Sequence, residues 1–451
     1  MEQAKNWEDV KPITDVNWLG CLLSSNLKRY KLGDIAEIII SSVDKKTKDG
    51  EQKVRLCNFV DVYHNWAITK SMHNSFMIAS AKEKDIERLS LKKGYVALTK
   101  DSETRDDIGI STYIADNLYN VILGYHCALV KPNEDILSGK YLNAFLHSNY
   151  IKKYFELNAT GSGMRYTLSI QTLYDMPILL PSLEEQEYIG NIFSTIDRKI
   201  ELNRSINHNL EAMAKQLYYY WFVQFDFPDE NGKPYKSSGG KMVWNEKLKR
   251  EIPGGWEVTN IGSILDKVFI TPRLSTDEYL PSGTYPIIDQ ATDVYYAGFT
   301  EREEAVVNQY PAIVFGDHSC AVKYVNFPFV RGADGTQVIL SKDSNIPIEY
   351  LYYAMKGVKI GKGYARHFSF LKEQPVIVPS EKEVKDFEDT AQTFFEQITR
   401  NRKEILSLTK QRDELLPLLM NGQVSLNYDL SAFSSVFSQT ILSIARLAVA
   451  I

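Results

Sequence analysis

Two stretches of the chain share a seven-residue repeat of apolar positions. In residues 184–221, apolar side chains return every three or four positions, which is typical of a helix whose apolar stripe faces a partner helix. Residues 381–420 repeat this pattern at a constant offset of 198 positions. We therefore predict two long helices that pair along these stripes. The matching positions include Ile189, Ile196, Leu210 and Leu217 in the first stretch, and Phe387, Phe394, Leu408 and Leu415 in the second.

The flanks of the two stretches repeat as well. Residues 177–182 read PILLPS and residues 375–380 read PVIVPS, again 198 positions apart. A fixed offset through a strand, a Pro-Ser break and a helix indicates an internal duplication. It argues against the alternative of two unrelated amphipathic helices, each packed on its own domain. Asn203 and Asn401 occupy the same step of the repeat, where a buried Asn would fix helix register.

The segments before each long helix carry short strand signals and one helical signal. In the first half, we predict strands at residues 35–40, 54–60, 94–99 and 126–130, a helix at 141–156 and a flexible polar loop at 160–166. In the second half, we predict strands at 312–315, 322–325 and 337–340 and a helix at 348–355. Each half is therefore expected to be a mixed α/β domain.

Composition and charge are those of an ordinary globular protein. The chain has 451 residues, 44% hydrophobic and 24% charged, with a net charge of −5. This acidic balance gives no global signal for nucleic-acid binding, although a local basic face can coexist with it. Four scattered cysteines without CxxC spacing suggest reduced thiols. Because we also find no signal peptide and no membrane-spanning apolar run, we predict a cytoplasmic location without membrane association.

Catalytic motifs are lacking in the sequence. The seven histidines form no HExxH spacing, and neither GxSxG nor GxxxxGK[ST] occurs. Residues 326–329 (NFPF) differ from the tetrad of adenine methyltransferases at their second position, and no glycine-rich cofactor loop accompanies them. We therefore predict a chain without catalytic residues, metal or cofactor.

Binding motifs are more evident. Each half has a glycine-containing loop that leads to an arginine, Arg165 or Arg366, and polar residues also follow a strand end in each half. Glycine lets the backbone approach a phosphate, and arginine binds phosphate or a guanine edge with two hydrogen bonds. For any one of these residues, a solvated loop tip is an equally good interpretation. The candidate DNA-binding residues are Lys100, Ser102, Thr104, Arg105, Gly161, Ser162, Arg165 and Tyr166 in the first half, and His318, Lys323, Lys362, Tyr364, Arg366 and His367 in the second.

Four motifs give the chain a resemblance to a known family, the specificity subunit of type I restriction-modification enzymes. They are PSLEEQ at residues 181–186, WFVQFD at 221–226, PGGWE at 253–257 and the helix end at 412–422. With the repeat, the resemblance extends over residues 30–426. Residues 380–383 depart from it, because they lack the full LEEQ sequence of the first copy, and the tail at 431–451 lies outside it.

The resemblance implies an α/β (α+β) fold: two pseudo-symmetric target recognition domains joined by two long antiparallel coiled-coil helices. The implied domain boundaries are residues 1–182 for the first recognition domain, 183–228 for the central helix, 229–252 for a linker, 253–380 for the second recognition domain, 381–426 for the distal helix and 427–451 for an unassigned tail.

The resemblance also implies a function without catalysis in this chain. Each recognition domain would read one half of a split double-stranded DNA target, and the helices would set the gap between the halves. Chemistry would belong to partner subunits. Modification subunits, docked on the helices, would methylate adenine at N6 with S-adenosylmethionine, and restriction subunits would use ATP and Mg²⁺ as motor-nucleases. The alternative is a coiled-coil interaction scaffold or regulator of a modification system without DNA specificity of its own.

Overall fold

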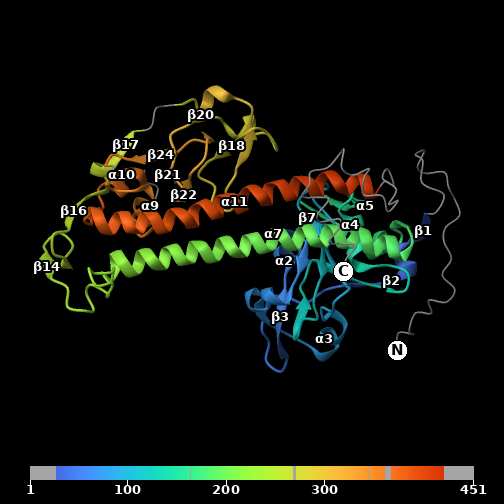
Figure 1. The fold of residues 1–451 in the computed structure, drawn as a ribbon. Helices are drawn as coiled ribbons and strands as arrows, with labels where there is room; N and C mark the ends of the chain where they lie inside the picture. The colour runs from blue at the N-terminus through green and yellow to red at the C-terminus, as the bar shows by residue number, and fades with distance from the viewer. Residues whose placement is uncertain (1–26, 163, 268–270, 344, 361–366, 421–451) are drawn as a thin grey trace. The chain divides into compact units, whose positions relative to one another are not determined.

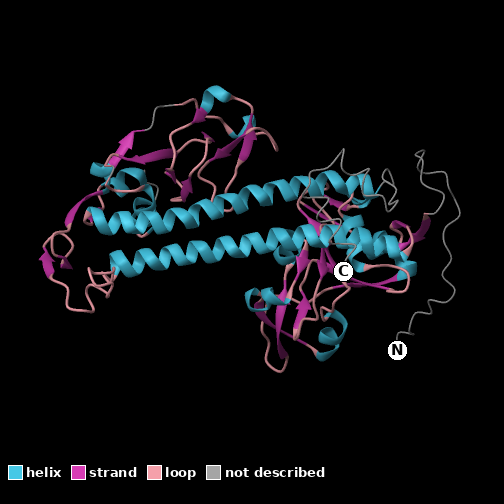
Figure 2. Cartoon of the chain, viewed as in Figure 1, coloured by secondary structure: helices cyan, strands magenta, loops and turns pink. Residues whose placement is uncertain are grey.

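The computed structural model describes residues 27–162, 164–267, 271–343, 345–360 and 367–420. The chain divides into two compact units. Unit 1 contains Met1–Leu202 and Ile405–Ile451, and unit 2 contains Asn203–Glu404. Each unit combines strands and short helices with segments of two long helices (Figure 1). Figure 2 shows this mixture of helix and strand in both parts of the chain, which confirms the predicted fold class.

Both long helices predicted from the seven-residue repeat are confirmed. α7 extends over Leu183–Tyr218 and continues as the π-helical segment η2, Tyr219–Val223. α11 extends over Glu381–Met420. Each helix begins in one unit and ends in the other, so the chain passes between the units twice as continuous helix. In the described part of the chain, no helix is both long enough and apolar enough to span a bilayer.

The beginning of α7 follows from the sequence PSLEEQ. The Ser182 backbone N–H donates to Glu185 Oε2 at 2.9 Å, and the Glu185 backbone N–H donates to Ser182 Oγ at 3.3 Å, which forms a capping box. Gln186 is buried and accepts a hydrogen bond from the Ser138 backbone N–H at 3.0 Å. Its amide donates to the carbonyls of Ile136 and Pro181, each at 3.1 Å. The motif therefore starts the helix and fastens it to the body of unit 1.

The central sheet of unit 1 has five strands. Their order is β2 (Ala36–Ile40), β10 (Cys127–Pro132), β6 (Val96–Thr99), β8 (Ser111–Ile114) and β4 (Ala67–Ile68). A second sheet has the order β5 (Met77–Ala81), β3 (Gln52–Cys57) and β9 (Val121–Leu123), with β3 parallel to β9. The remaining elements are β1 (Lys28–Lys31), α1 (Leu32–Ile35), α2 (Phe59–His64), η1 (Lys70–Ser75), α3 (Glu83–Leu89), β7 (Asp101–Ser102), α4 (Gly139–Leu146), α5 (Asn149–Asn158), β11 (Thr160–Ser162), β12 (Arg165–Thr167), α6 (Ile170–Tyr174) and β13 (Pro177–Leu180).

The central sheet of unit 2 has four strands. Their order is β17 (Leu265–Lys267), β24 (Thr336–Ser341), β21 (Ala312–Gly316) and β22 (Val322–Val325). A second sheet has the order β19 (Gly298–Thr300), β18 (Tyr285–Ile288), β23 (Phe329–Arg331) and β20 (Val306–Val307), with β18 parallel to β23. The remaining elements are β14 (Met242–Asn245), β15 (Arg250–Pro253), β16 (Glu257–Asn260), α8 (Ile261–Ile264), η3 (Thr276–Glu278), η4 (Glu303–Ala305), α9 (Ile348–Lys356), α10 (His367–Lys372) and β25 (Pro375–Val378).

The two units share the order of seven strands in their two sheets. The order β2-β10-β6-β8 corresponds to β17-β24-β21-β22, and in both sheets these neighbours are antiparallel. In the second sheets, β5-β3-β9 corresponds to β19-β18-β23, with the same combination of one antiparallel and one parallel pair. The duplication deduced from the helix repeat therefore includes both sheets.

Segments of the two long helices pack together within each unit. In unit 1, the core contains Ile189, Phe193 and Ile196 of α7 with Leu408 and Leu415 of α11. The core of unit 2 contains Ala214 of α7 with Phe387, Ala391 and Ile398 of α11. Early α7 residues pack with late α11 residues in unit 1, and late α7 residues pack with early α11 residues in unit 2, so the two helices are antiparallel.

Several local predictions are wrong. The strand predicted at 54–60 ends at Cys57, because Asn58 and Asp61 form a capping box that starts α2. The single helix at 141–156 is two helices, since Ser148 caps α5 by accepting from the Ile151 N–H. The expected flexible loop at 160–166 contains the hairpin β11–β12. The segment 229–252, read as a linker, includes the strands β14 and β15, and Ile252 lies in the core of unit 2.

Candidate nucleic-acid interface

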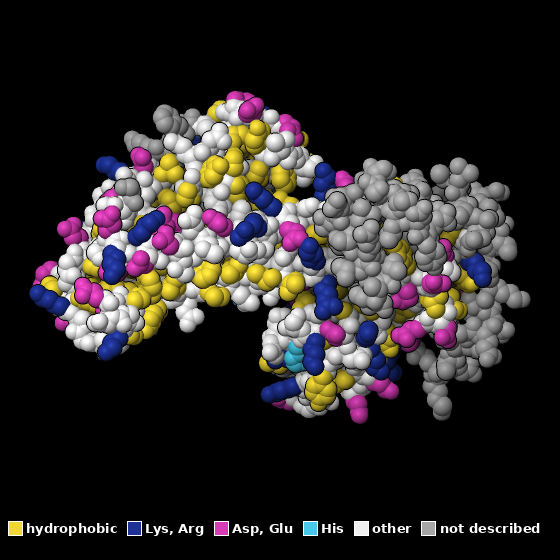
Figure 3. All heavy atoms as spheres, in the orientation of Figure 1, with side chains coloured by type: hydrophobic (Ala, Val, Ile, Leu, Met, Phe, Trp, Pro, Cys, Tyr) yellow, Lys and Arg dark blue, Asp and Glu magenta, His cyan; other side chains and the backbone are white. Residues whose placement is uncertain are grey.

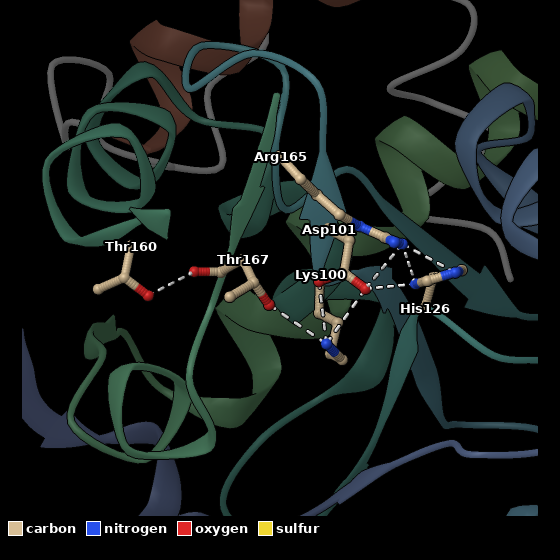
Figure 4. A network of polar contacts seen from close by, with 6 residues as sticks. All are labelled: Lys100, Asp101, His126, Thr160, Arg165 and Thr167. Carbon is tan, nitrogen blue, oxygen red and sulfur yellow. Dashed lines mark hydrogen bonds and ion pairs between the residues drawn. The ribbon is translucent and has the colours of Figure 1, made fainter. Parts of the chain in front are cut away.

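Polar side chains from three strand ends meet at one edge of the central sheet in unit 1. Lys100 follows β6, and Asp101 opens β7, which pairs with β12 so that Thr167 lies opposite Asp101. His126 directly precedes β10, and Arg165 opens β12. Figure 4 shows these side chains converging on the carboxylate of Asp101. Pairing of β6 with β10 and of β7 with β12 therefore joins residues that are far apart in the sequence.

Asp101 is the centre of this network. Its side chain is 8% exposed, and Lys100 Nζ donates to its two oxygens at 3.0 and 3.1 Å. Lys100 Nζ also donates to Thr167 Oγ1 at 3.2 Å. Burial opposes ionisation of Asp101, but hydrogen bonds from Thr167, His126 and Lys100 outweigh it and lower the pKa of this carboxyl. Asp101 therefore acts as a buried anion that holds several donors at the sheet edge.

His126 and Arg165 extend the network to the surface. His126 Nδ1 lies 2.5 Å from Asp101 Oδ2. Arg165 Nη2 contacts both ring nitrogens of His126, with 2.8 Å to Nε2, and lies 3.6 Å from Asp101 Oδ2. The Arg165 side chain is 56% exposed, so its guanidinium is held at one end and open to a ligand at the other.

The other predicted residues of unit 1 lie beside this network. The Arg105 guanidinium carbon is 5.0 Å from the centre of the Tyr166 ring, which is a cation–π contact. Thr104 follows β7 and donates its backbone N–H at 3.3 Å to Oγ of Ser102, the last residue of that strand. Gly161 has a φ of +143° in β11, and a Cβ there would lie 2.1 Å from the Arg165 carbonyl oxygen. Gly161 is therefore required for the hairpin that presents Arg165. Ser162 is part of the same strand.

The equivalent edge of unit 2 has different side chains. His318 is exposed on the turn after β21, and its backbone N–H donates to Gln290 Oε1 at 3.2 Å. Gln290 Nε2 donates to the Asp334 carbonyl at 2.7 Å, and Ser319 Oγ donates to the Gln290 carbonyl at 2.6 Å. Gln290 therefore ties two loops together through their backbone groups. Arg273 pairs with the exposed Asp334 beside them.

Two predicted residues of unit 2 are buried. Lys323 lies within β22, and its Nζ donates to the carbonyls of Val294 at 2.8 Å and Tyr295 at 3.3 Å. Burial lowers the pKa of Lys323, although Asp289, 3.9 Å away, opposes this shift. His367 is buried at the beginning of α10. Lys362, Tyr364 and Arg366 lie outside the described residues.

The two asparagines of the helix repeat face the opposite helix. Asn203 Nδ2 donates to Glu404 Oε2, and Asn401 Nδ2 donates to Asn207 Oδ1, each at 2.8 Å. Both asparagines are buried. Each pair joins α7 to α11, so a shift of register would leave buried polar groups without these partners. Their role in fixing register stays a prediction.

Asp101, His126 and Gln290 are not among the residues predicted from the sequence. The first two lie 25 residues apart, and only the β6–β10 pairing brings them together. A usable signal was the polar residue at the beginning of the predicted strand 126–130, opposite the polar end of strand 94–99. Among the described residues, no group of three or more His, Cys, Asp or Glu side chains is arranged to hold a metal ion. The unit 1 edge offers hydrogen-bond donors and cations, which suit recognition of an anionic or acceptor-rich ligand.

Comparison with known proteins gives consistent matches. Residues 24–212 and 253–410 match the family model described as type I restriction modification DNA specificity domain. The type I restriction enzyme MjaIX specificity subunit of Methanocaldococcus jannaschii is 26% identical over 451 residues, covering 93% of this chain and 94% of that protein. The HindI specificity subunit of Haemophilus influenzae is 24% identical, covering 89% of this chain and all of that protein. Among solved structures, the type I restriction-modification S subunit from M. genitalium has a similar fold, with a TM-score of 0.52, 16% identity and coverage of 89% of this chain and 98% of that one.

Proposed function

This chain belongs to the type I restriction-modification DNA specificity family, and we propose that it reads a two-part double-stranded DNA target, one half with each unit. The family match covers segments of both units, and DNA target recognition is the function of this family's specificity subunits. The observation that carries the two-part target is the duplicated sheet. β6 and β10 occupy the same places in the sheet of unit 1 as β21 and β24 occupy in the sheet of unit 2. The side chains at the ends of these strands differ between the units.

The candidate contacts belong to this proposal. In unit 1 they are Lys100, Ser102, Thr104, Arg105, Gly161, Ser162, Arg165 and Tyr166, and in unit 2 they are His318, Lys323, Lys362, Tyr364, Arg366 and His367. The network around Asp101 supports Arg165 most directly, because its guanidinium is exposed and oriented. The domain boundaries at residues 182, 380 and 426 are part of the same proposal, as is a gap between half-sites set by α7 and α11.

The partners are proposed from the family as well. Modification subunits would supply adenine-N6 methylation with S-adenosylmethionine, restriction subunits would supply an ATP- and Mg²⁺-dependent nuclease, and this chain would contribute no catalytic group. We place the assembly in the cytoplasm. A docking surface for the modification subunit is supported by three apolar side chains at seven-residue intervals in unit 2. They are Ile206, Met213 and Tyr220, which are 36%, 52% and 39% exposed. Figure 3 shows hydrophobic side chains gathered along α7.

The proposal is tested by binding and by methylation. The full chain, mixed with its modification subunit, should shift a DNA fragment that carries the target in a gel, and binding should weaken as salt rises. Sequencing of methylated bases in cells with and without the gene should show a bipartite adenine motif that depends on it. Absence of DNA binding with the partner present, or a continuous motif, would contradict the proposal.

The docking surface has its own test. Met213→Glu introduces a charge into an exposed apolar stripe, so association with the modification subunit should weaken while the fold is retained. Lys215→Gln, on the same helix, changes an exposed charge outside the stripe and serves as a control in the same pull-down assay. Unchanged association of the Met213→Glu variant would place the docking surface elsewhere.

A further inference from the structure

The polar network of unit 1 fixes one arginine more tightly than a general phosphate contact needs. Asp101 is buried in β7, where the pairing with β12 fixes its backbone. His126 has a φ of +71°, and its backbone carbonyl accepts from the Lys100 N–H at 2.9 Å. Both residues are therefore held by main-chain interactions before their side chains meet.

The imidazole of His126 contacts both an anion and a cation. Nδ1 is 2.5 Å from Asp101 Oδ2, and Nε2 is 2.8 Å from Arg165 Nη2. Arg165 Nη2 also contacts Nδ1 and lies 3.6 Å from Asp101 Oδ2. The Tyr125 ring packs against the imidazole, with 3.7 Å between ring centres. If Nδ1–H donates to Asp101, then Nε2 accepts from the arginine, because a neutral imidazole carries one donor and one acceptor. The buried carboxylate thereby sets the orientation of the His126 ring, and the ring in turn holds the guanidinium of Arg165.

Arg165 keeps part of its guanidinium open. Within the described part of the chain, its side-chain contacts all involve Nη2. Because Nη2 carries two N–H groups, one of them remains for a ligand beside Nη1–H or Nε–H, and either pair forms a planar fork. A planar fork with its orientation fixed matches the paired O6 and N7 acceptors of guanine in the major groove. Phosphate contacts tolerate displacement of the cation, and the nearby Asp101 carboxylate weakens the net attraction of Arg165 for a phosphate.

We propose that Arg165 reads a guanine in the half-site bound by unit 1, and that Asp101 is its positioning residue, acting through His126 and through its own ion pair with the guanidinium. This inference rests on the proposed function, because it names the base that the DNA-binding edge selects. Lys100 has a structural role in this network, since its ammonium donates to Asp101 and Thr167 and its side chain is only 16% exposed.

Arg105 provides a matched control. It lies in the same unit and carries the same charge, but its guanidinium is exposed over Tyr166, and no contact to a carboxylate is found within the described residues. Its expected role is a phosphate contact. Arg105→Lys should leave base preference unchanged, and Arg105→Ala should weaken binding to all sequences alike and reduce the salt dependence by about one unit of slope.

The experiment uses the full chain with its modification subunit and a plasmid library in which both half-sites are randomised. Wild-type methylation gives the bipartite motif. For Arg165→Lys, which keeps the charge and removes the fork, preference for guanine at one position should fall about 10- to 100-fold. The other half-site should be unchanged. Asp101→Asn should relax the same position to a smaller extent, and the double variant should resemble Arg165→Lys alone, because the two residues act in series.

The outcomes separate this inference from the proposed function. No guanine in the unit 1 half-site, or an Arg165→Lys variant that weakens all sequences uniformly, overturns the inference while the bipartite reading stands. Relaxation by Asp101→Asn at several positions would mean that Asp101 supports the fold rather than Arg165. Circular dichroism of each variant identifies loss of folding, and Arg165→Lys, at an exposed position, still decides the question if Asp101→Asn does not fold. Failure of the wild-type complex to bind DNA is a failure of the proposed function itself.

Discussion

The strand-end edges of the two units share their backbone arrangement but carry different side chains. In unit 1 the Lys100 N–H donates to the His126 carbonyl at 2.9 Å, and in unit 2 the Asp317 N–H donates to the Gly335 carbonyl at 2.7 Å. His126 and Gly335 both have left-handed backbones, with φ of +71° and +77°. The paired positions thus share geometry but not side chains. The sheet is maintained by strand pairing, so residues on its edge are free to differ between the units.

In unit 2, sterics restrict which residue can stand at this position. A Cβ at Gly335 would lie 2.7 Å from His318 Cδ2. The equivalent position in unit 1 is His126, whose ring contacts the Asp101 carboxylate. The imidazole therefore stands on opposite strands in the two edges, after β21 in unit 2 and before β10 in unit 1. Two half-sites of different sequence are the expected consequence for DNA recognition.

The largest expected effect concerns the cores that hold the two edges in place. Phe193 in unit 1 and Phe387 in unit 2 are both fully buried on the long helices. Each change to alanine should lower the free energy of unfolding by about 3–5 kcal/mol, because it removes apolar burial and leaves a cavity. Hydrogen exchange should locate the loss in unit 1 for Phe193→Ala and in unit 2 for Phe387→Ala. Equal loss of protection in both units for either variant would show that the units unfold together.

Many of the elements that the two units share were predictable from the sequence. The heptad repeat gives both long helices, and apolar runs give β6, β10, β21, β22 and β24, because these elements are encoded by local periodicity. The hairpin β11–β12 was missed because its residues show no alternation and its pairing with β7 comes from a distant part of the chain. Asp101 and His126 were missed for the same reason. The capping box of Asn58 and Asp61 was a readable local signal that the strand prediction overlooked.

A smaller effect should distinguish the units by their response to acid. In unit 1, burial lowers the pKa of His147 to about 4, and its Nε2 donates to the Ser111 carbonyl at 2.9 Å. The unfolded chain then binds more protons than the folded one between about pH 6.5 and 4, so stability falls as pH falls through this window. In unit 2, burial raises the pKa of Glu349, which favours its protonated form, so acid acts there in the opposite direction.

Denaturation by guanidinium at pH 7 and pH 5 measures this difference. At pH 5 the free energy of unfolding of the wild-type chain should be lower by about 2 kcal/mol because of His147. This pH lies roughly 1.5 units below the ordinary histidine pKa, so the unfolded chain carries the proton that the folded chain excludes. His147→Gln retains a donor for Ser111 without a titrating ring, so this loss should disappear. Glu349→Gln is the control in unit 2 and should keep the loss. An unchanged pH dependence in His147→Gln would assign the acid sensitivity to other groups.

The smallest effect concerns the left-handed position that the two edges share. Gly335→Ala should destabilise unit 2 by about 1–2 kcal/mol, because alanine disfavours this conformation and its Cβ meets His318. Adding His318→Ala should relieve the contact but not the backbone strain, so part of the loss should remain. His126→Gly in unit 1 removes the same strain while it removes the imidazole contacts, and these opposing changes should leave stability within about 1 kcal/mol of wild type. Thermal unfolding of the four proteins measures both effects. A neutral Gly335→Ala variant would mean that the shared hydrogen bond at this turn does not require a left-handed residue, and the equivalence of the two edges would then rest on strand order alone.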